Sequence, residues 1–179
     1  MPAVTWMQSI KRFSQQKMAW LLLFVSAAGL LSAALYFQHV MDLQPCVKCI
    51  YQRTAVIGVM FAALIPLIVN NTYTRSVGFV LWAYSAYKGL LAAREHLEVI
   101  FAENPFFAIC DIVPNFPSFM PLHEWFPAIF AARGECNDNS WQFAGMGMAS
   151  WLEIIFIAYL AVLAIVLVAQ AFPQIRTNT

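Results

Sequence analysis

Charged residues are scarce in this chain. Asp, Glu, Lys and Arg make up only 11% of its 179 residues, whereas 61% are hydrophobic. Soluble globular domains carry about 25% charged residues. The chain also lacks internal repeats and low-complexity tracts. Its composition therefore excludes an ordinary soluble domain and predicts an integral membrane protein.

Four segments are long and apolar enough to cross a bilayer, which takes about 20 residues in a helix. The first has no charged residue, the second has only Arg53, the third has Lys88, and the fourth has Glu153 in its first turn. We therefore predict an all-α integral membrane protein with a four-helix transmembrane bundle. The predicted spans are residues 18–37, 50–69, 77–93 and 151–170.

The first span follows Lys11, Arg12 and Lys17, which resembles the basic flank of a secretory signal peptide. A signal peptide, however, has an apolar core of only about 7–15 residues. The uninterrupted run over residues 18–37 is longer than that. It therefore predicts an uncleaved membrane anchor.

Acidic residues are absent from three segments that flank the spans, residues 1–17, 70–76 and 171–179, although each of these contains Lys or Arg. Short cytoplasmic segments of membrane proteins are enriched in basic residues. The pattern therefore predicts two cytoplasmic tails and one cytoplasmic loop. Residues 38–49 and 94–150 are then extracytoplasmic loops, and all nine acidic residues lie in these loops or at their membrane border.

All four cysteines fall in the two extracytoplasmic loops. Cys46 and Cys49 end the first loop, and Cys110 and Cys136 lie in the second. An even number of cysteines facing an oxidising compartment predicts two disulfides. A disulfide across the interval from Cys110 to Cys136 would stabilise the loop by roughly 3 kcal/mol if its role were structural. The Cys46-x-x-Cys49 ring is too small to stabilise much, so redox or metal chemistry is the better interpretation there.

Zinc is the competing interpretation, since four cysteines can form a tetrahedral site. The second pair is separated by 25 residues rather than two, and an oxidising compartment disfavours thiolate ligands. His39, His96 and His123 add no pair at ligand spacing within one helix. We therefore expect no metal. A disulfide-stapled membrane scaffold without catalysis remains a further alternative.

The second loop is unusually rich in proline and aromatic residues. Five apolar residues recur at the spacing of one helical face, and Gly134 is placed to end the helix. They predict a short helix on the membrane surface. A helix packed on the outer ends of the spans is an equal alternative, and Pro127 limits the length of either. The face consists of Leu122, Trp125, Phe126, Ile129 and Phe130.

Arg53 lies one helical turn after Cys49, about 6 Å further along the helix axis. The N-terminus of the second span and the arginine both favour a thiolate at Cys49. A snorkelling interfacial arginine is the structural alternative, and snorkelling is the role that we expect for Lys88. The sequence thus predicts a reactive dithiol beside a fixed positive charge at the membrane surface.

Several motifs together resemble the bacterial disulfide bond formation protein B (DsbB) family. They are residues 38–40 (QHV), 45–53 (PCVKCIYQR), 82–86 (WAYSA) and 156–160 (FIAYL), with Cys110 and Cys136 in the long second loop. The resemblance covers nearly the whole chain. The vitamin K epoxide reductase family is an alternative, but its active Cys-x-x-Cys typically lies late in the chain.

The resemblance implies a multi-pass protein of the bacterial inner membrane that acts as a protein-dithiol:quinone oxidoreductase. It would reoxidise a periplasmic DsbA-type thiol oxidase and pass the electrons to ubiquinone or menaquinone. Cys110 and Cys136 would form the disulfide that meets the partner, Cys46 would exchange with Cys136, and Cys49 would face the quinone. Arg53 would assist there, and His96 would donate a hydrogen bond or proton to the quinone. The expected partners are the thiol oxidase, quinone and lipid, with no nucleic acid.

Overall fold

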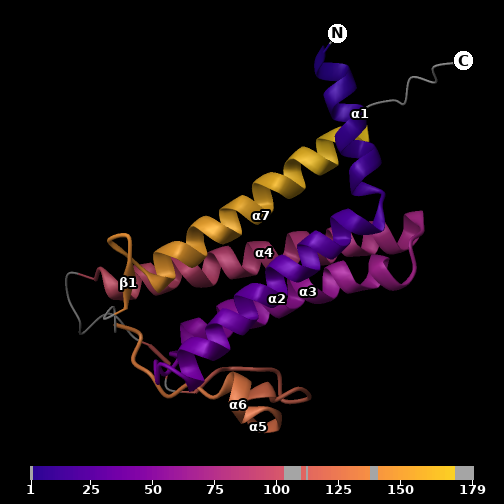
Figure 1. The fold of residues 1–179 in the computed structure, drawn as a ribbon. Helices are drawn as coiled ribbons and strands as arrows, with labels where there is room; N and C mark the ends of the chain where they lie inside the picture. Colours follow the sequence, from indigo (N-terminus) through magenta and orange to yellow (C-terminus); the bar gives the residue numbers. More distant parts are fainter. Residues whose placement is uncertain (1, 103–109, 112, 138–140, 172–179) are drawn as a thin grey trace, which may run out of the picture.

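The computed structural model describes residues 2–102, 110–111, 113–137 and 141–171. Most of these residues are helical, and a small antiparallel hairpin is the one sheet among them (Figure 1). The helices are α1 (Pro2–Ser14), α2 (Lys17–His39), α3 (Val47–Ile68), α4 (Thr72–Ile100), α5 (Leu122–Trp125), α6 (Pro127–Phe130) and α7 (Met148–Ala171), and the strands are β1 (Gln142–Phe143) and β2 (Met146–Gly147).

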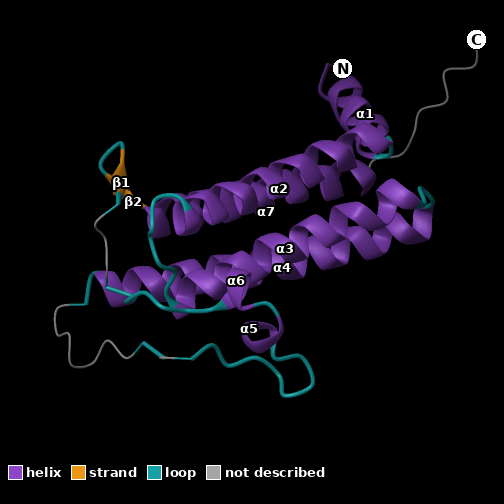
Figure 2. Ribbon diagram, turned by 60° about the horizontal axis from the view of Figure 1, so that its bottom comes forward, coloured by secondary structure: helices purple, strands orange, loops and turns teal. Residues whose placement is uncertain are grey.

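Four long helices form the body of the molecule. Helix α3 packs against α2 and α4, and α4 packs against α7 (Figures 1 and 2). Their contacts are close because small residues lie between them. A Cβ atom on Gly89 of α4 would lie 2.3 Å from the Phe156 ring of α7. The core combines large and small side chains, among them Trp20, Val59, Ala63, Trp82, Ala86 and Phe156.

Helices α2, α3 and α7 are long and apolar enough to cross a membrane. This supports the prediction of a helical membrane protein. Helix α4 has 29 residues, more than the predicted third segment 77–93, but it also carries five charged side chains that lower its mean hydropathy. These are Arg75, Lys88, Arg94, Glu95 and Glu98.

The predicted N-terminal tail contains a helix, α1, which the sequence reading did not anticipate. Its end is tied to the end of α7. Lys11 Nζ donates to the Gln170 carbonyl oxygen at 2.9 Å, and Gln170 Nε2 donates to Ser14 Oγ at 2.7 Å. These bonds hold α1 and the end of α7 together at one end of the molecule (Figure 1).

The segment between α4 and α7 contains two single helical turns rather than the one short helix predicted over its aromatic face. The break falls at Phe126, which is the C-cap of α5 and the N-cap of α6, because Pro127 cannot donate a backbone hydrogen bond. Phe130 is buried, whereas Trp125 and Phe126 are exposed. The β1–β2 hairpin was also not predicted, and it turns at Ala144 and Gly145, both with positive φ.

Candidate dithiol site

The Cys46–Cys49 pair is built into the first turn of α3. The helix begins at Val47, so Cys46 is its N-cap, and Cys46 Sγ accepts a hydrogen bond from the Cys49 backbone N–H at 3.2 Å. The two Sγ atoms are 2.8 Å apart, and both cysteines are free thiols. The helix N-terminus directs unpaired N–H groups at Cys46, which favours negative charge there.

The structure favours a thiolate at Cys46, the N-cap residue of α3. A hydrogen bond from the Cys49 thiol is the largest cause that lowers the pKa of Cys46, to about 5, and a hydrogen bond from His96 adds to it against the opposing effect of burial. The sequence had favoured a thiolate at Cys49. The difference arises because the N-cap residue, and not the residue three positions later, faces the helix N–H groups and His96.

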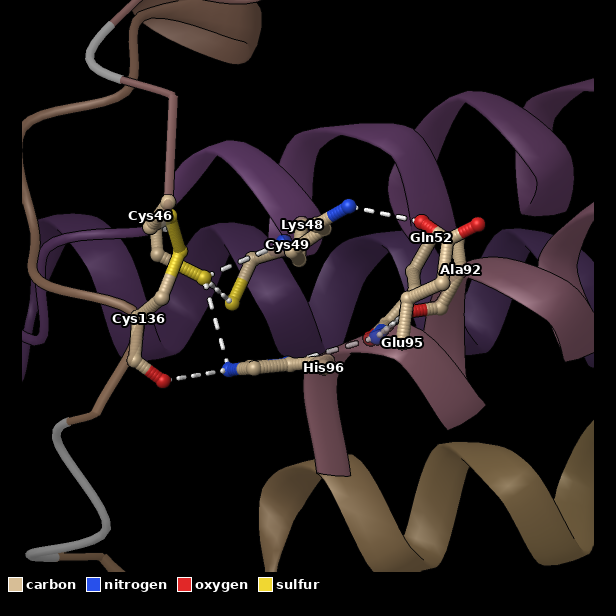
Figure 3. The surroundings of a disulfide bond; sticks show 9 residues. Cys46, Lys48, Cys49, Gln52, Ala92, Glu95, His96 and Cys136 are labelled. Carbon is tan, nitrogen blue, oxygen red and sulfur yellow. Dashed lines mark hydrogen bonds and ion pairs between the residues drawn. A yellow bond between two sulfur atoms is a disulfide. The ribbon is translucent and has the colours of Figure 1, made fainter. Parts of the chain in front are cut away.

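His96 joins the two cysteine pairs. Its Nε2 atom lies 3.6 Å from Cys46 Sγ and 3.1 Å from the Cys136 carbonyl oxygen, and its Nδ1 atom lies 3.4 Å from Gln52 Nε2 (Figure 3). The ring is buried near the end of α4, with 4% of its surface exposed. His96 therefore contacts a thiol of the first pair and the backbone of the second.

Arg53 is also buried, and it is held by groups that the sequence did not identify. Its Nη1 donates to Gln38 Oε1 at 2.7 Å and also to the Ile129 carbonyl oxygen of α6. Gln38 Nε2 donates to the Ala128 carbonyl oxygen at 3.2 Å. Gln38 belongs to the motif at residues 38–40, and this motif was the only feature of the sequence that pointed to it. The arginine thus connects α2, α3 and the second loop.

Cys110 and Cys136 form a disulfide, as the resemblance implied. Cys136 is buried beside the first pair because the chain before it docks on Pro45. The backbone N–H groups of Arg133 and Gly134 both donate to the Pro45 carbonyl oxygen at 3.0 Å. Only glycine fits at residue 134, since a Cβ atom there would lie 2.1 Å from the Gln44 carbonyl oxygen. The sequence pattern predicts a helix stop at Gly134, whereas in the structure this glycine lets the chain dock on Pro45.

A cavity of about 110 Å³ borders Cys46, Cys49, Arg53 and His96. Its other walls are mostly apolar side chains of α2 and α7, such as Leu30. Two residues that line this cavity each have a buried polar atom without a hydrogen-bond partner among the described residues. These atoms are Gln52 Oε1 and Arg53 Nε. An apolar cavity with an unused cationic donor beside a thiol suits a flat apolar molecule that carries carbonyl oxygens.

The donor atoms of Cys46, Cys49 and His96 lie within 4.8 Å of one another, which is close enough to hold a metal ion. The sequence had found no such cluster, because His96 is 47 residues from Cys49. Two thiolates and an imidazole are ligands that zinc accepts. The same cluster also suits a redox-active cysteine pair, in which the His96 imidazole donates a hydrogen bond to a cysteine sulfur.

Comparison with known proteins identifies the family. Residues 16–166 match the family model described as disulfide bond formation protein DsbB. The chain is 48% identical to disulfide bond formation protein B of Pseudoalteromonas atlantica over 92% of this chain and 96% of that protein. It is 46% identical to the Idiomarina loihiensis protein, over 92% and 91%, and 44% identical to the Vibrio parahaemolyticus protein, over 98% of both. The chain therefore belongs to the DsbB family of disulfide-forming membrane proteins.

Proposed function

We propose that the protein reoxidises a periplasmic DsbA-type dithiol oxidase and passes the electrons through its two cysteine pairs to a membrane quinone. The carrying observation is the position of His96 Nε2, which contacts both Cys46 Sγ and the Cys136 carbonyl oxygen beside the Arg53 cavity. Thiol–disulfide exchange requires the attacking sulfur to reach the disulfide. The buried approach of Cys136 to Cys46 supports exchange between the pairs.

The exchange steps between the cysteines need no outside oxidant, and an electron acceptor is required only when electrons leave the first pair. A partner thiolate attacks Cys110, so that a mixed disulfide forms and the Cys110–Cys136 bond breaks. Cys136 then attacks Cys46 of an oxidised first pair, so that a Cys46–Cys136 bond forms and the Cys49 thiolate leaves. The partner's second thiolate attacks the partner sulfur of the mixed disulfide, which releases the oxidised partner and the Cys110 thiolate. Cys110 then attacks Cys136, which restores the Cys110–Cys136 bond and releases the Cys46 thiolate, so that two electrons have reached the Cys46–Cys49 pair. A bound quinone would supply the two-electron acceptor and leave as the hydroquinone after taking up two protons.

The residues of the cavity fit a quinone. Arg53 Nε is a buried donor without a partner among the described residues, and it can meet a quinone oxygen on which negative charge develops. A second cavity of about 700 Å³ lies against α2 and α7 and shares Leu30 with the first. It is lined largely by apolar side chains and can receive a prenyl tail. Both ubiquinone and menaquinone meet this description.

We further propose that α2, α3, α4 and α7 all cross the bacterial inner membrane, with both termini cytoplasmic. The basic residues Lys11 and Arg12 lie in the last turn of α1 and Lys17 begins α2, whereas Cys46 and Cys49 lie beyond the other end of α2. Helix α4 packs along α3 for much of its length, which supports a fourth span despite its charges. In intact spheroplasts, an impermeant thiol reagent should label Cys110 after reduction, whereas a cysteine introduced by Tyr73→Cys at the exposed start of α4 should stay unlabelled in a Cys110→Ser background. Labelling of Tyr73→Cys would contradict this topology.

Trapping of a mixed disulfide tests the proposed function. If Cys110 receives the partner and Cys136 resolves the complex, Cys136→Ser should accumulate a disulfide-linked complex with a periplasmic dithiol protein through Cys110. The matched control is Cys110→Ser, which should give no such complex. If neither variant nor any other cysteine variant forms a mixed disulfide, the protein is a disulfide-stapled scaffold instead.

A further inference from the structure

Gln52 is a buried polar residue to which neither the sequence motif nor the proposed relay gives a role. It lies on α3 one turn after Lys48, and only 1% of its surface is exposed. Its Nε2 atom is 3.3 Å from the Ala92 carbonyl oxygen and 3.4 Å from His96 Nδ1. A carbonyl oxygen only accepts hydrogen bonds. The Ala92 contact therefore fixes which end of the amide faces α4, and that end is the N–H donor.

The same contacts determine which nitrogen of His96 carries the proton. Because Gln52 presents an N–H to it, Nδ1 must be the accepting nitrogen, and the proton of the neutral ring is then on Nε2. An independent contact agrees with this assignment. Nε2 faces the Cys136 carbonyl oxygen at 3.1 Å, and that oxygen also requires a donor. The Nε2–H group then points to the region of Cys46 Sγ, 3.6 Å away (Figure 3).

We propose that Gln52 is a positioning residue that holds His96 as the Nε2–H tautomer, so that a neutral imidazole donates to Cys46 Sγ and to the Cys136 backbone. The step that needs this donor rests on the proposed function. When Cys110 attacks Cys136, the Cys110–Cys136 bond forms, the Cys46–Cys136 bond breaks, and the electron pair stays on Cys46 Sγ. The structure has the bonding of the product of this step, with Cys110–Cys136 joined and Cys46 free.

This tautomer also decides between the two uses of the Cys46, Cys49 and His96 cluster. A histidine that binds a metal through Nε2 presents a bare nitrogen there, and its Nδ1–H donates to a carboxylate, carbonyl or water. Gln52 imposes the reverse arrangement. The contacts of Gln52 therefore favour the cluster as a thiolate site over a metal site.

Nitrogen NMR of ¹⁵N-histidine-labelled protein in detergent tests the proposal directly. At a pH where the imidazoles are neutral, the His96 signals, identified by their loss in His96→Asn, should show a bare Nδ1 and a protonated Nε2. Gln52→Met has similar size but no donor, and it should shift His96 toward a mixture of tautomers. Gln52→Glu supplies an acceptor instead and should protonate Nδ1. Gln38→Met is the matched control, since it removes a buried glutamine that contacts Arg53, and it should leave the His96 signals in place.

The kinetic consequence is measured separately. In Gln52→Met, exchange between the two cysteine pairs should slow by roughly 10- to 100-fold, because an orienting hydrogen bond to the donor is lost. A protonated Nδ1 in the wild-type protein, or His96 signals unchanged in Gln52→Met, would overturn the proposal. The NMR spectrum needs neither partner nor quinone, so it tests the His96 tautomer even if the proposed relay is wrong. Conversely, a different tautomer would overturn the role of Gln52 without contradicting the relay.

Discussion

The two cysteine pairs are held in opposite ways. Cys46 and Cys49 are three residues apart in one helical turn, and the N-terminus of α3 and His96 act on their sulfur atoms. Cys110 and Cys136 are 26 residues apart and belong to the segment between α4 and α7. A secondary-structure element thus positions the first pair, whereas docking of a loop on Pro45 positions the second.

Exposure differs within each pair rather than between the pairs. Cys46 is 2% exposed and Cys136 is 3% exposed, whereas Cys110 is partly accessible and borders a cavity of about 670 Å³ with Asp111 and Glu135. The four cysteines of this site thus differ in how accessible they are from solvent. Cys110 is partly accessible, Cys136 and Cys46 are both buried beside His96, and Cys49 borders the cavity next to Arg53. Predictions that disturb one pair and spare the other test this arrangement.

Arg53→Ala should have the largest effect on the helix-borne pair. Removing a donor to a developing anion in a low-dielectric site costs about 2–4 kcal/mol, or roughly 30- to 1,000-fold in the rate of quinone reduction. Arg53→Lys should recover only part of the rate, because an ammonium cannot reproduce the planar guanidinium fork. Steady-state quinone reduction, compared with single-turnover thiol exchange at Cys110, measures this effect.

Arg53 also donates to the Ile129 carbonyl oxygen, so Arg53→Ala disturbs the second loop as well. Gln38→Met separates the two roles, since it removes the contact to the Ala128 carbonyl oxygen and one acceptor of Arg53 Nη1 but keeps the cation and its bond to the Ile129 carbonyl oxygen. A slowing of thiol exchange should appear in both variants, and the strong slowing of quinone reduction only in Arg53→Ala. Equal slowing of quinone reduction in the two variants would make Arg53 a structural residue.

Gly134→Ala should have an intermediate effect and should act on the loop-borne pair. The added Cβ atom would meet the Gln44 carbonyl oxygen at 2.1 Å, so the chain before Cys136 must move away from Pro45. Exchange between Cys136 and Cys46 should slow by roughly tenfold, which corresponds to about 1.4 kcal/mol. Quinone reduction by a small dithiol that reaches the first pair directly should change little. Gly29→Ala is the control, because a Cβ atom there meets nothing within 4 Å; a similar loss in both variants would contradict the docking role.

The smallest effect is a pH dependence of the reduced first pair. Hydrogen bonds from Cys49 and His96 lower the pKa of Cys46 to about 5. A thiol with a lowered pKa is ionised above that value, so one thiolate should persist as the pH falls from 8 to 6 and disappear through about pH 5. Ultraviolet thiolate absorbance of the reduced protein, with Cys46→Ser as the reference, measures it. A thiolate that is already lost near pH 8 would contradict the assignment.

Much of this site could be predicted from the sequence because its chemistry is local. The Cys-x-x-Cys spacing and Arg53 four residues after Cys49 lie within one helix, where distance follows from position. Gln52, Gln38 and Gly134 could not be assigned, since their roles depend on contacts across 15 to 90 residues. The same limit applies to helix α1. Its basic residues predicted a cytoplasmic tail, and its helical docking on α7 depends on a partner at the other end of the chain.

Transfer of electrons between the two pairs is the central claim, and one measurement tests it most directly. The purified protein in mild detergent, loaded with quinone, is mixed with a reduced DsbA-type dithiol protein, and quinone absorbance is followed in wild type, Cys110→Ser and Cys49→Ser. Wild type should reduce the quinone, and each variant should lose this reaction, because each removes one end of the relay. Quinone reduction at the wild-type rate in Cys110→Ser, or its absence in the wild-type protein, would contradict the account.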